Sequence, residues 1–394
     1  MRKAPSTQAG PPARQAVRRS GPSRPAQAAA VPGGITPDHA PLYAALDLGT
    51  NNCRLMIAAY ANGQFRIIEA FSRIVRLGEG LSQNGQLQER AIERAVAALK
   101  ICAEKITRRQ VVKVRAVATQ ACRIARNGQA FIRRVEAETG LKLQLITPEE
   151  EARLSVIGCA SLLDAPAKAA IVLDVGGGST EISWVELEKH KAPEGAPPIR
   201  GARHGLNVSS RPPVPKYWIS IPTGVVSLAE RFPEPANGDK QVWFDTMTAD
   251  VESALSSFKA PEVLRPHFDA QDAYIVGTSG AITSLAGLHL RLERYDRSRV
   301  DGLWMSDTEC SDVIERLLIM GPEGREAEAC IGRDRADLVL AGAAILQAVQ
   351  NLWPCQRLRV ADRGLREGLL LSMVRKKSRR RRRGKRKPAV RAEA

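Results

Sequence analysis

One glycine-rich stretch, residues 169–183, constrains the fold of this chain more than any other. It reads Ala-Ala-Ile-Val-Leu-Asp-Val-Gly-Gly-Gly-Ser-Thr-Glu-Ile-Ser. The apolar run at residues 170–173 is typical of a buried strand, and Asp174 stands where that strand ends. Consecutive glycines let a backbone approach a ligand closely, and an acid beside them can hold a cation that neutralises phosphate. The stretch predicts a phosphate–Mg²⁺ turn or, equally, a tight hairpin between two strands.

A second stretch of the same kind favours the phosphate turn. Residues 43–54 read Tyr-Ala-Ala-Leu-Asp-Leu-Gly-Thr-Asn-Asn-Cys-Arg, again an apolar strand followed by an aspartate, Asp47, and a glycine. Two such stretches far apart in one chain predict two similar domains that face one cleft. The dinucleotide-binding fingerprint is excluded because Glu181 stands where its third glycine is required, and the P-loop is excluded because Gly-Lys-Ser/Thr is missing.

The net charge of +17 belongs to the two ends of the chain. Residues 1–40 and 373–394 carry nearly all of it, and the body between them is close to neutral. Both ends lack hydrophobic periodicity, so we expect them to be disordered. A nucleic-acid-binding core is therefore not indicated, although the chain as a whole is basic.

Cysteine usage and hydropathy bear on the cellular compartment. The seven cysteines are scattered without a Cys-x-x-Cys pair, so neither a disulfide framework nor a zinc site is expected, and a reducing cytoplasm fits. The apolar runs are far shorter than the roughly 18 residues that a membrane-spanning helix requires. We therefore predict a cytoplasmic location and no membrane partner.

Residues 147–151, Thr-Pro-Glu-Glu-Glu, are typical of the start of a helix. Thr147 suits the N-cap and Pro148 suits N1, which predicts a capping box in which Glu150 bonds back to the N-cap amide. Glu151 has no such structural task and begins a face that should pack inward. An acid at the rim of a buried face can act as a general base, although the residues alone favour one more N-terminal helix acid.

Ordered motifs along the chain resemble the exopolyphosphatase/guanosine pentaphosphate phosphatase (Ppx/GppA) family, within the superfamily of sugar kinases and actin-like ATPases. One motif reads Ala-Thr-Gln-Ala-Cys-Arg-Ile-Ala-Arg-Asn at residues 118–127. The others lie at residues 74–81, 148–154, 221–226, 277–281, 335–345 and 362–368, and the resemblance covers residues 42–372. The first loop departs from the family's usual Gly-Ser-Asn-Ser by having Thr50, Asn52 and Cys53, which removes one hydroxyl.

The resemblance implies an α/β fold of two actin-like, ribonuclease H-like domains with a cleft between them, flanked by disordered basic tails. The implied segments are a tail at 1–40, a first domain at 41–168, a second domain at 169–355, a final strand and helix at 356–374 that return to the first domain, and a tail at 375–394. Residues 188–215, rich in Pro, Gly and charge, are interpreted as a long inserted loop. Residues 335–350 are predicted to be one helix.

The resemblance also implies roles for individual residues. Glu151 matches the family's catalytic glutamate, and Arg123 is implied to be a second catalytic residue that contacts phosphate beside it. Arg76 alone could be a solvated arginine, but the resemblance favours a phosphate fork. The Mg²⁺ ligands are expected to be Asp47, Asp174 and Glu181. The other phosphate-binding residues are expected to be Gly49, Thr50, Asn51, Gly176, Gly177, Gly178, Ser179 and Thr180.

The implied activity is Mg²⁺-dependent release of orthophosphate from the end of inorganic polyphosphate. Hydrolysis of guanosine pentaphosphate (pppGpp) is the alternative, and a small-molecule kinase or a non-catalytic polyanion- or RNA-binding protein is less favoured. The basic tails favour polyphosphate and would also allow nonspecific contact with RNA or other polyanions. A monomer and a homodimer both stay open, as does whether residues 277–280 contact a nucleoside or close the domain core.

Overall fold

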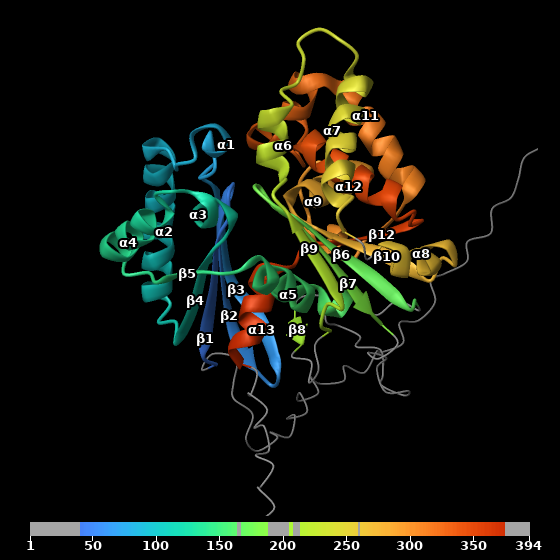
Figure 1. The fold of residues 1–394 in the computed structure, drawn as a ribbon. Coiled ribbons are helices and arrows are strands. Elements are labelled where there is room, and N and C mark those ends of the chain that lie inside the picture. The colour runs from blue at the N-terminus through green and yellow to red at the C-terminus, as the bar shows by residue number, and fades with distance from the viewer. Residues whose placement is uncertain (1–39, 164–166, 188–204, 208–212, 259–260, 375–394) are drawn as a thin grey trace, which may run out of the picture. The chain divides into compact units, whose positions relative to one another are not determined.

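The computed structural model describes residues 40–163, 167–187, 205–207, 213–258 and 261–374. Both predicted tails, apart from Ala40, and most of the predicted insertion at 188–215 lie outside these residues. The described part of the chain contains two six-stranded sheets with helices packed on them, which confirms the predicted α/β class (Figure 1). None of the described helices is long and apolar enough to cross a membrane.

The first sheet has the strand order β5-β4-β1-β2-β3-β8. Its strands are β1 (Leu42–Leu48), β2 (Asn52–Ala61), β3 (Gln64–Ile74), β4 (Lys113–Ala118), β5 (Leu143–Leu145) and β8 (Gly205–Asn207). β1, β2 and β3 form an antiparallel meander, and β4 and β5 continue the sheet parallel to β1. β8 corrects the sequence analysis, because a segment interpreted as loop pairs antiparallel with β3.

Helices cover the first sheet on two faces. One face packs on the helices that follow β3 and β4, which are α1 (Leu81–Asn84), α2 (Glu89–Arg108), α3 (Gln120–Ile124) and α4 (Gly128–Thr139). The other face packs on α5 (Pro148–Cys159) and on the last described helix, α13 (Leu365–Val374). Strand alternation explains the division, since Ala44 and Leu46 of β1 enter the first core and Ala45 enters the second.

The second sheet repeats the plan of the first. Its order is β11-β12-β10-β6-β7-β9, with an antiparallel meander of β6, β7 and β9 and with β10 parallel to β6. The strands are β6 (Ala169–Val175), β7 (Thr180–Glu186), β9 (Tyr217–Ile221), β10 (Ala273–Thr278), β11 (Trp304–Ser306) and β12 (Arg357–Ala361). β6 thus occupies the place that β1 has in the first sheet, and each of the two strands carries one of the predicted aspartates near its end.

The helices of the second half form one large core with this sheet. They are α6 (Val225–Arg231), α7 (Lys240–Leu255), α8 (Pro261–Asp269), α9 (Gly280–His289), α10 (Arg297–Val300), α11 (Asp307–Ala327) and α12 (Val339–Leu352). α11 is broken at Gly321, whose backbone is not helical. The predicted helix at 335–350 starts later than expected, at Val339, because the residues before it form a short 3₁₀ turn, Arg333–Arg335.

Two helices, α5 and α13, cross in backbone contact between the sheets (Figure 1). A Cβ on Gly158 of α5 would lie 1.9 Å from the carbonyl oxygen of Gly364, and one on Gly368 of α13 would lie 2.0 Å from that of Leu154. Glycine is therefore required at both positions. Of the segment at 356–374, only helix α13 packs on the first sheet, because β12 belongs to the second.

Candidate active site

A cavity of about 680 Å³ is lined by both glycine-rich loops. The loops touch each other, since a Cβ on Gly178 would lie only 2.7 Å from the Oγ1 atom of Thr50. The structure therefore confirms the strand–turn–strand prediction at 169–183 and brings the two turns together. The predicted phosphate ligands that line the cavity are Gly49, Thr50, Asn51, Gly176, Gly177, Gly178 and Ser179.

Thr180 is the one residue of these two loops that the structure removes from the predicted phosphate site. Its hydroxyl donates to the carbonyl of Thr223 at 2.7 Å, and its side chain is fully buried. Thr180 begins β7, and successive side chains of a strand point to opposite faces. Ser179 and Glu181 on either side of it face the cavity, so strict alternation was the signal that would have excluded Thr180.

Of the acidic residues that line the cavity, four come from the two glycine-rich stretches and from α5: Asp47, Glu151, Asp174 and Glu181. Burial raises the pKa of Asp47 to about 6, against the opposing charges of Arg54 and Arg366. Burial and the charge of Asp174 raise the pKa of Glu181 to about 7. Burial also raises the pKa of Asp174, although a hydrogen bond from Ser155 opposes this. Burial is therefore the main reason why ionisation of these carboxyl groups is costly, and repulsion between neighbouring carboxylates adds to the cost.

Glu151 lies in the first turn of α5 and is only 8% exposed. Its Oε2 atom accepts a hydrogen bond from Nη1 of Arg123 at 3.1 Å, and that guanidinium also donates to the carbonyl of Ile146 at 2.8 Å. Burial, with the charge of Glu181 as the next cause, raises the pKa of Glu151 well above its usual range. Arg123 does not itself line the cavity, but it contacts two residues that do, Glu151 and Gln120, whose Oε1 atom accepts from Nη2 at 2.7 Å.

The start of α5 agrees with the sequence prediction in one half of the capping box. The Thr147 hydroxyl accepts the backbone N–H of Glu150 at 3.2 Å, and Pro148 occupies the first turn. The prediction of the reciprocal bond is wrong, because the Glu150 carboxylate pairs with Arg115 of β4 and not with the N-cap amide. Glu150 thus ties α5 to the first sheet and leaves Glu151 facing the cavity.

The donor set suits Mg²⁺ held in part by a substrate. Within the described residues, no three His, Cys, Asp or Glu side chains form a ready-made metal cluster. Mg²⁺ is commonly bound by one or two carboxylates together with water and substrate phosphate, so such a cluster is not required. The buried oxygens of Asp47 and Asp174 fit that mode, because burial raises the pKa of each and a bound cation would offset the same cost.

Arg76 does not line this cavity. Its guanidinium pairs with Asp337, with Nη1 3.0 Å from Oδ2 and Nη2 3.3 Å from Oδ1. It borders a separate cavity of about 290 Å³. The phosphate fork predicted for Arg76 is therefore corrected to an ion pair, because the carboxylate of Asp337 already occupies both arms of the guanidinium.

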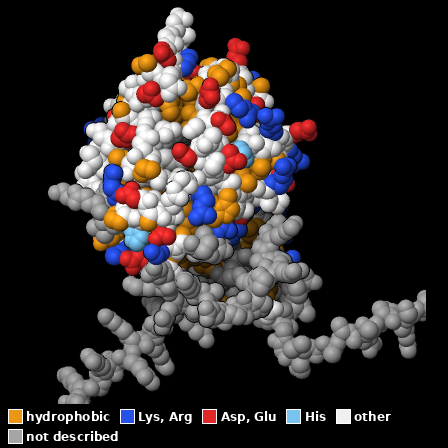
Figure 2. Space-filling model, turned by 90° about the vertical axis from the view of Figure 1, so that its right-hand side faces the viewer, with side chains coloured by type: hydrophobic (Ala, Val, Ile, Leu, Met, Phe, Trp, Pro, Cys, Tyr) orange, Lys and Arg blue, Asp and Glu red, His pale blue; other side chains and the backbone are white. Residues whose placement is uncertain are grey.

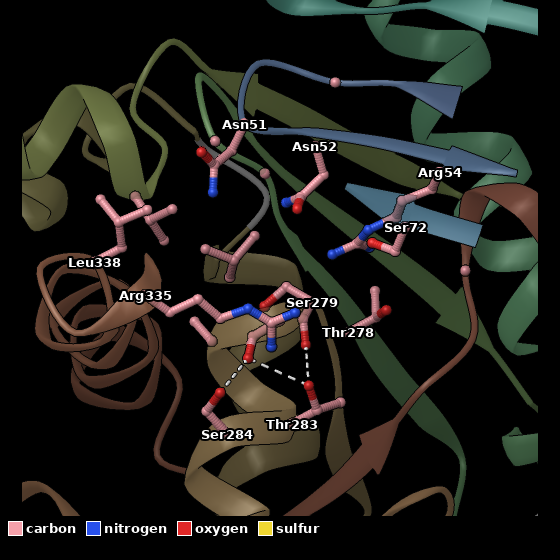
Figure 3. A pocket seen from close by; sticks show the side chains of 18 of the residues that line it. Asn51, Asn52, Arg54, Ser72, Thr278, Ser279, Thr283, Ser284, Arg335 and Leu338 are labelled. Carbon is pink, nitrogen blue, oxygen red and sulfur yellow. Dashed lines mark hydrogen bonds between the residues drawn. The ribbon is translucent and has the colours of Figure 1, made fainter. Parts of the chain in front are cut away.

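Six arginines that the sequence analysis did not single out line the main cavity, and three of them form no salt bridge with a described residue: Arg54, Arg335 and Arg366. Arg54 follows the first loop on β2, Arg335 ends the 3₁₀ turn before α12, and Arg366 lies in the first turn of α13. Figure 3 shows Arg54 and Arg335 entering the cavity from facing walls. Burial and the charges of Arg366 and Arg335 lower the pKa of Arg54. Among the described residues no salt bridge holds any of these three, although the charges of Asp47 and Asp362 act on Arg54, and we call the three the arginine wall.

The signal for these arginines was present in the sequence. Arg54 is the residue that directly follows the first loop, and the other two stand inside the motifs at 335–345 and 362–368. The third glycine loop also reaches the cavity, since Thr278, Ser279 and Gly280 line it. This placement does not decide whether that loop contacts a nucleoside.

Two repeated sheets, paired Asp–Gly loops and a cavity of acids and arginines define a phosphoryl-transfer enzyme with the actin-like ATPase fold. A model of the Ppx/GppA phosphatase family matches residues 56–377, so the chain belongs to that family. Enzymes of the family act on phosphoanhydrides and generally depend on divalent metal ions.

Solved structures agree with this assignment. The chain is 30% identical to the Ppx/GppA family member of Aquifex aeolicus, with a TM-score of 0.65 over 85% of this chain and 97% of that one. It is 26% identical to an exopolyphosphatase-like protein, with a TM-score of 0.68 over 85% and 98% of the two chains. An exopolyphosphatase from Cytophaga hutchinsonii shares the fold, at 21% identity, with a TM-score of 0.70 over 84% and 97%.

Proposed function

We propose that this chain is a Mg²⁺-dependent exopolyphosphatase that removes orthophosphate from the end of inorganic polyphosphate. The observation that carries the proposal is the convergence of two glycine-rich loops, the carboxylates beside them and the arginine wall on one cavity. Acids suit the activation of water and the binding of a cation, and arginines suit a chain of phosphates. A site with both at once fits hydrolysis of a polyanion.

The terminal phosphoryl group would lie between the two loops. Backbone N–H groups of Gly177 and Gly178, with the Ser179 hydroxyl, would surround its oxygens. The Gly49 N–H already donates to the carbonyl of Asn52 at 2.9 Å, so Gly49 would shape the first loop without donating to phosphate. Asp47 and Asp174, with Glu181 as a further donor, would hold Mg²⁺, which when bound neutralises the charge of the phosphate oxygens. Preorganised donors of this kind stabilise the charge that develops during phosphoryl transfer.

Glu151 would act as the general base. Its carboxylate orients a water molecule in line with the terminal phosphorus and accepts the water proton as the new P–O bond forms. The bridging P–O bond breaks, and the shortened polyphosphate leaves with the electron pair. Arg123 holds Glu151 in place through the 3.1 Å bond, so its role would be to orient the base.

The arginine wall would bind the phosphates behind the terminal one. Arg54 lies next to Asp47, and Arg335 and Arg366 extend the positive wall from the second half of the chain. A guanidinium can bind a phosphate through two parallel hydrogen bonds. This wall takes the place of the phosphate fork that the sequence predicted at Arg76.

Hydrolysis of pppGpp is the second candidate. The cavity continues past the arginines to the third glycine loop and to Tyr295, which leaves room for a group larger than phosphate. The tails favour polyphosphate, because cationic segments release counterions when they meet a polyanion. On the face in Figure 2 the acidic and basic side chains of the described residues are interspersed, so a broad cationic surface is not seen there. Nonspecific contact with RNA would involve the tails, because residues 1–40 and 373–394 carry nearly all of the net charge.

The test is phosphate release in Mg²⁺ buffer from long polyphosphate and from pppGpp, side by side. Faster release from polyphosphate supports the proposal, and faster release from pppGpp supports the second candidate. ATP-dependent phosphorylation of an acceptor without release to water would identify a kinase. Tight binding of polyphosphate without any release would identify a non-catalytic polyanion-binding protein. A chelated control with EDTA tests the metal in the same assay.

A further inference from the structure

We propose that segment 75–82, which contains Arg76, is a clasp that positions the phosphate-binding elements of the two sheets relative to one another. Arg76 is then a positioning residue, and the phosphate does not touch it. The proposal rests on the proposed function, because it concerns the same site. Its evidence is a set of contacts that leads from this one segment to both glycine-rich loops and to the arginine wall.

The backbone of segment 75–82 supports the first loop. The N–H groups of Val75 and Arg76 donate to the carbonyl of Asn51 at 2.8 and 3.0 Å, and Gly78 N–H donates to the carbonyl of Thr50 at 2.9 Å. Arg76 has a left-handed backbone with φ of 45°, a conformation that a non-glycine residue rarely adopts. The surrounding bonds hold this backbone in place, which is expected where a residue is fixed for a task.

The Arg76 side chain leads from the first loop to the arginine wall. Besides its two bonds to the Asp337 carboxylate, Nη2 donates to the carbonyl of Asp334 at 3.3 Å. Both partners flank Arg335, which lines the main cavity. One residue thus fixes the first loop by its main chain and the position of Arg335 by its side chain.

A second contact joins the same segment to the second glycine-rich loop. The Glu230 carboxylate of α6 accepts the Gly80 N–H at 3.0 Å and the Ser82 hydroxyl at 2.7 Å. The first residues of α6 donate to the second loop, Val225 N–H to the Gly176 carbonyl at 2.9 Å and the next N–H to the Gly177 carbonyl at 2.8 Å. Helix α6 therefore links the second glycine-rich loop to segment 75–82.

The ion pair between Arg76 and Asp337 should contribute little to the stability of the fold. The side chains of Arg76 and Asp337 are 38% and 50% exposed, and exposed pairs contribute little to folding. Its effect should appear in the geometry of the site. If the clasp opens, a smaller fraction of molecules has the binding-competent arrangement, and the apparent affinity for substrate falls by that fraction. Turnover at saturation should change much less, because bound substrate restores the arrangement.

The test is a double-mutant cycle with Arg76→Gln and Asp337→Asn, measured on the preferred substrate. We expect each single variant to raise KM by roughly tenfold with kcat within about twofold, and the double variant to match the singles. The control is Arg134→Gln, since Arg134 and Glu89 form a pair of similar exposure, 38% and 63%, between helices on one face of the first sheet. The control should leave KM unchanged. Melting temperatures should stay near that of the wild type in all variants.

Direct phosphate binding by Arg76 would give a different pattern. Asp337→Asn would then have little effect on KM, and the effects of the two substitutions would not coincide. That pattern, or an unchanged KM in Arg76→Gln, would overturn the proposal.

Hydrogen exchange supplies a measurement that does not need activity. Amides of residues 49–54 should exchange faster in Arg76→Gln and Asp337→Asn but not in Arg134→Gln. If the wild type hydrolyses neither substrate, the proposed function fails, and exchange still decides the clasp. Unaltered exchange in the two clasp variants would reject it.

Discussion

Replacement of Glu151 by glutamine separates chemistry from folding. The glutamine has nearly the same shape, and its amide oxygen can still accept the 3.1 Å bond from Arg123. It cannot accept the proton of the attacking water. A positioned general base contributes about 10²- to 10⁴-fold to a rate, so we expect kcat to fall by that factor, about 3–5 kcal/mol in activation free energy.

The same substitution should not destabilise the fold. Burial and the charge of Glu181 raise the pKa of Glu151, so an ionised Glu151 is costly in the free protein. Glutamine resembles the protonated form and removes one of four clustered negative charges. We therefore expect an unchanged or slightly raised melting temperature, and substrate binding that stays close to that of the wild type.

The pH dependence of kcat tests the role of Glu151 as general base in a second way. A base with a raised pKa is protonated below that pKa, so kcat of the wild type should rise with pH through it. Glu151→Gln should lose this limb of the profile, because no proton is left to titrate at that position. The assay is single-turnover phosphate release across a pH series at saturating Mg²⁺.

Glu150→Gln is the matched control one residue away. Glu150 pairs with Arg115 in a partly exposed salt bridge, so its loss should cost roughly 0.5–1 kcal/mol of stability and leave kcat nearly unchanged. The reasoning is refuted if Glu150→Gln abolishes turnover while Glu151→Gln retains it.

Three further predictions concern the metal, the stability at low pH and the C-terminal tail. Asp174→Asn should raise the Mg²⁺ concentration that half-maximal turnover requires, and excess EDTA should stop the wild type; full activity in EDTA would remove metal from the mechanism. Glu69 accepts bonds from Lys105 and Arg109 at 2.6 and 2.7 Å, which lower its pKa to about 2 from 4.5. Its stabilising contribution is therefore present above about pH 4.5 and disappears as the pH falls through about 2. The free energy of unfolding of Glu69→Gln, measured by urea denaturation, should be roughly 1 kcal/mol lower than that of the wild type at neutral pH. The two values should converge as the pH approaches 2. Deletion of residues 375–394 should raise KM for long polyphosphate at low salt and spare short chains, and an equal effect on both lengths would deny the tail a part in substrate capture.

Local sequence patterns predicted the elements whose structure is decided within a few residues. The strand–turn–strand at 169–183 and the N-cap at Thr147 are of this kind, because their hydrogen bonds lie close in sequence. Period-two alternation would have predicted the inward turn of Thr180 as well. The repeat of an Asp–Gly turn in two distant stretches was enough to predict that both loops line one cavity.

Partners that are distant in sequence could not be predicted in the same way. Arg76 meets Asp337 across 261 positions, and nothing near either residue in the sequence indicates the pairing. Glu150 has two competing partners, the nearby N-cap amide and Arg115 on β4. The capping-box pattern considers only the N-cap amide, because that partner is close in sequence. Glu150 instead pairs with Arg115, which becomes its neighbour only when α5 packs on the sheet.

The return of α13 to the first sheet sets an order for folding during synthesis. Its Leu369 and Leu370 are fully buried in the same core as Ala45 and Met56 of β1 and β2. On the face that packs on α5 and α13, the strands near the N-terminus therefore have only α5 to cover them at first, and the part under α13 stays uncovered until more than three hundred further residues have been translated. Contacts this far apart in sequence form late and slowly. The second sheet, whose core uses residues from 156 to 361, can be completed before the first one closes. A nascent chain stalled before residue 365 should consequently hold a folded second half and an unfinished first half, exposed to chaperones and proteases.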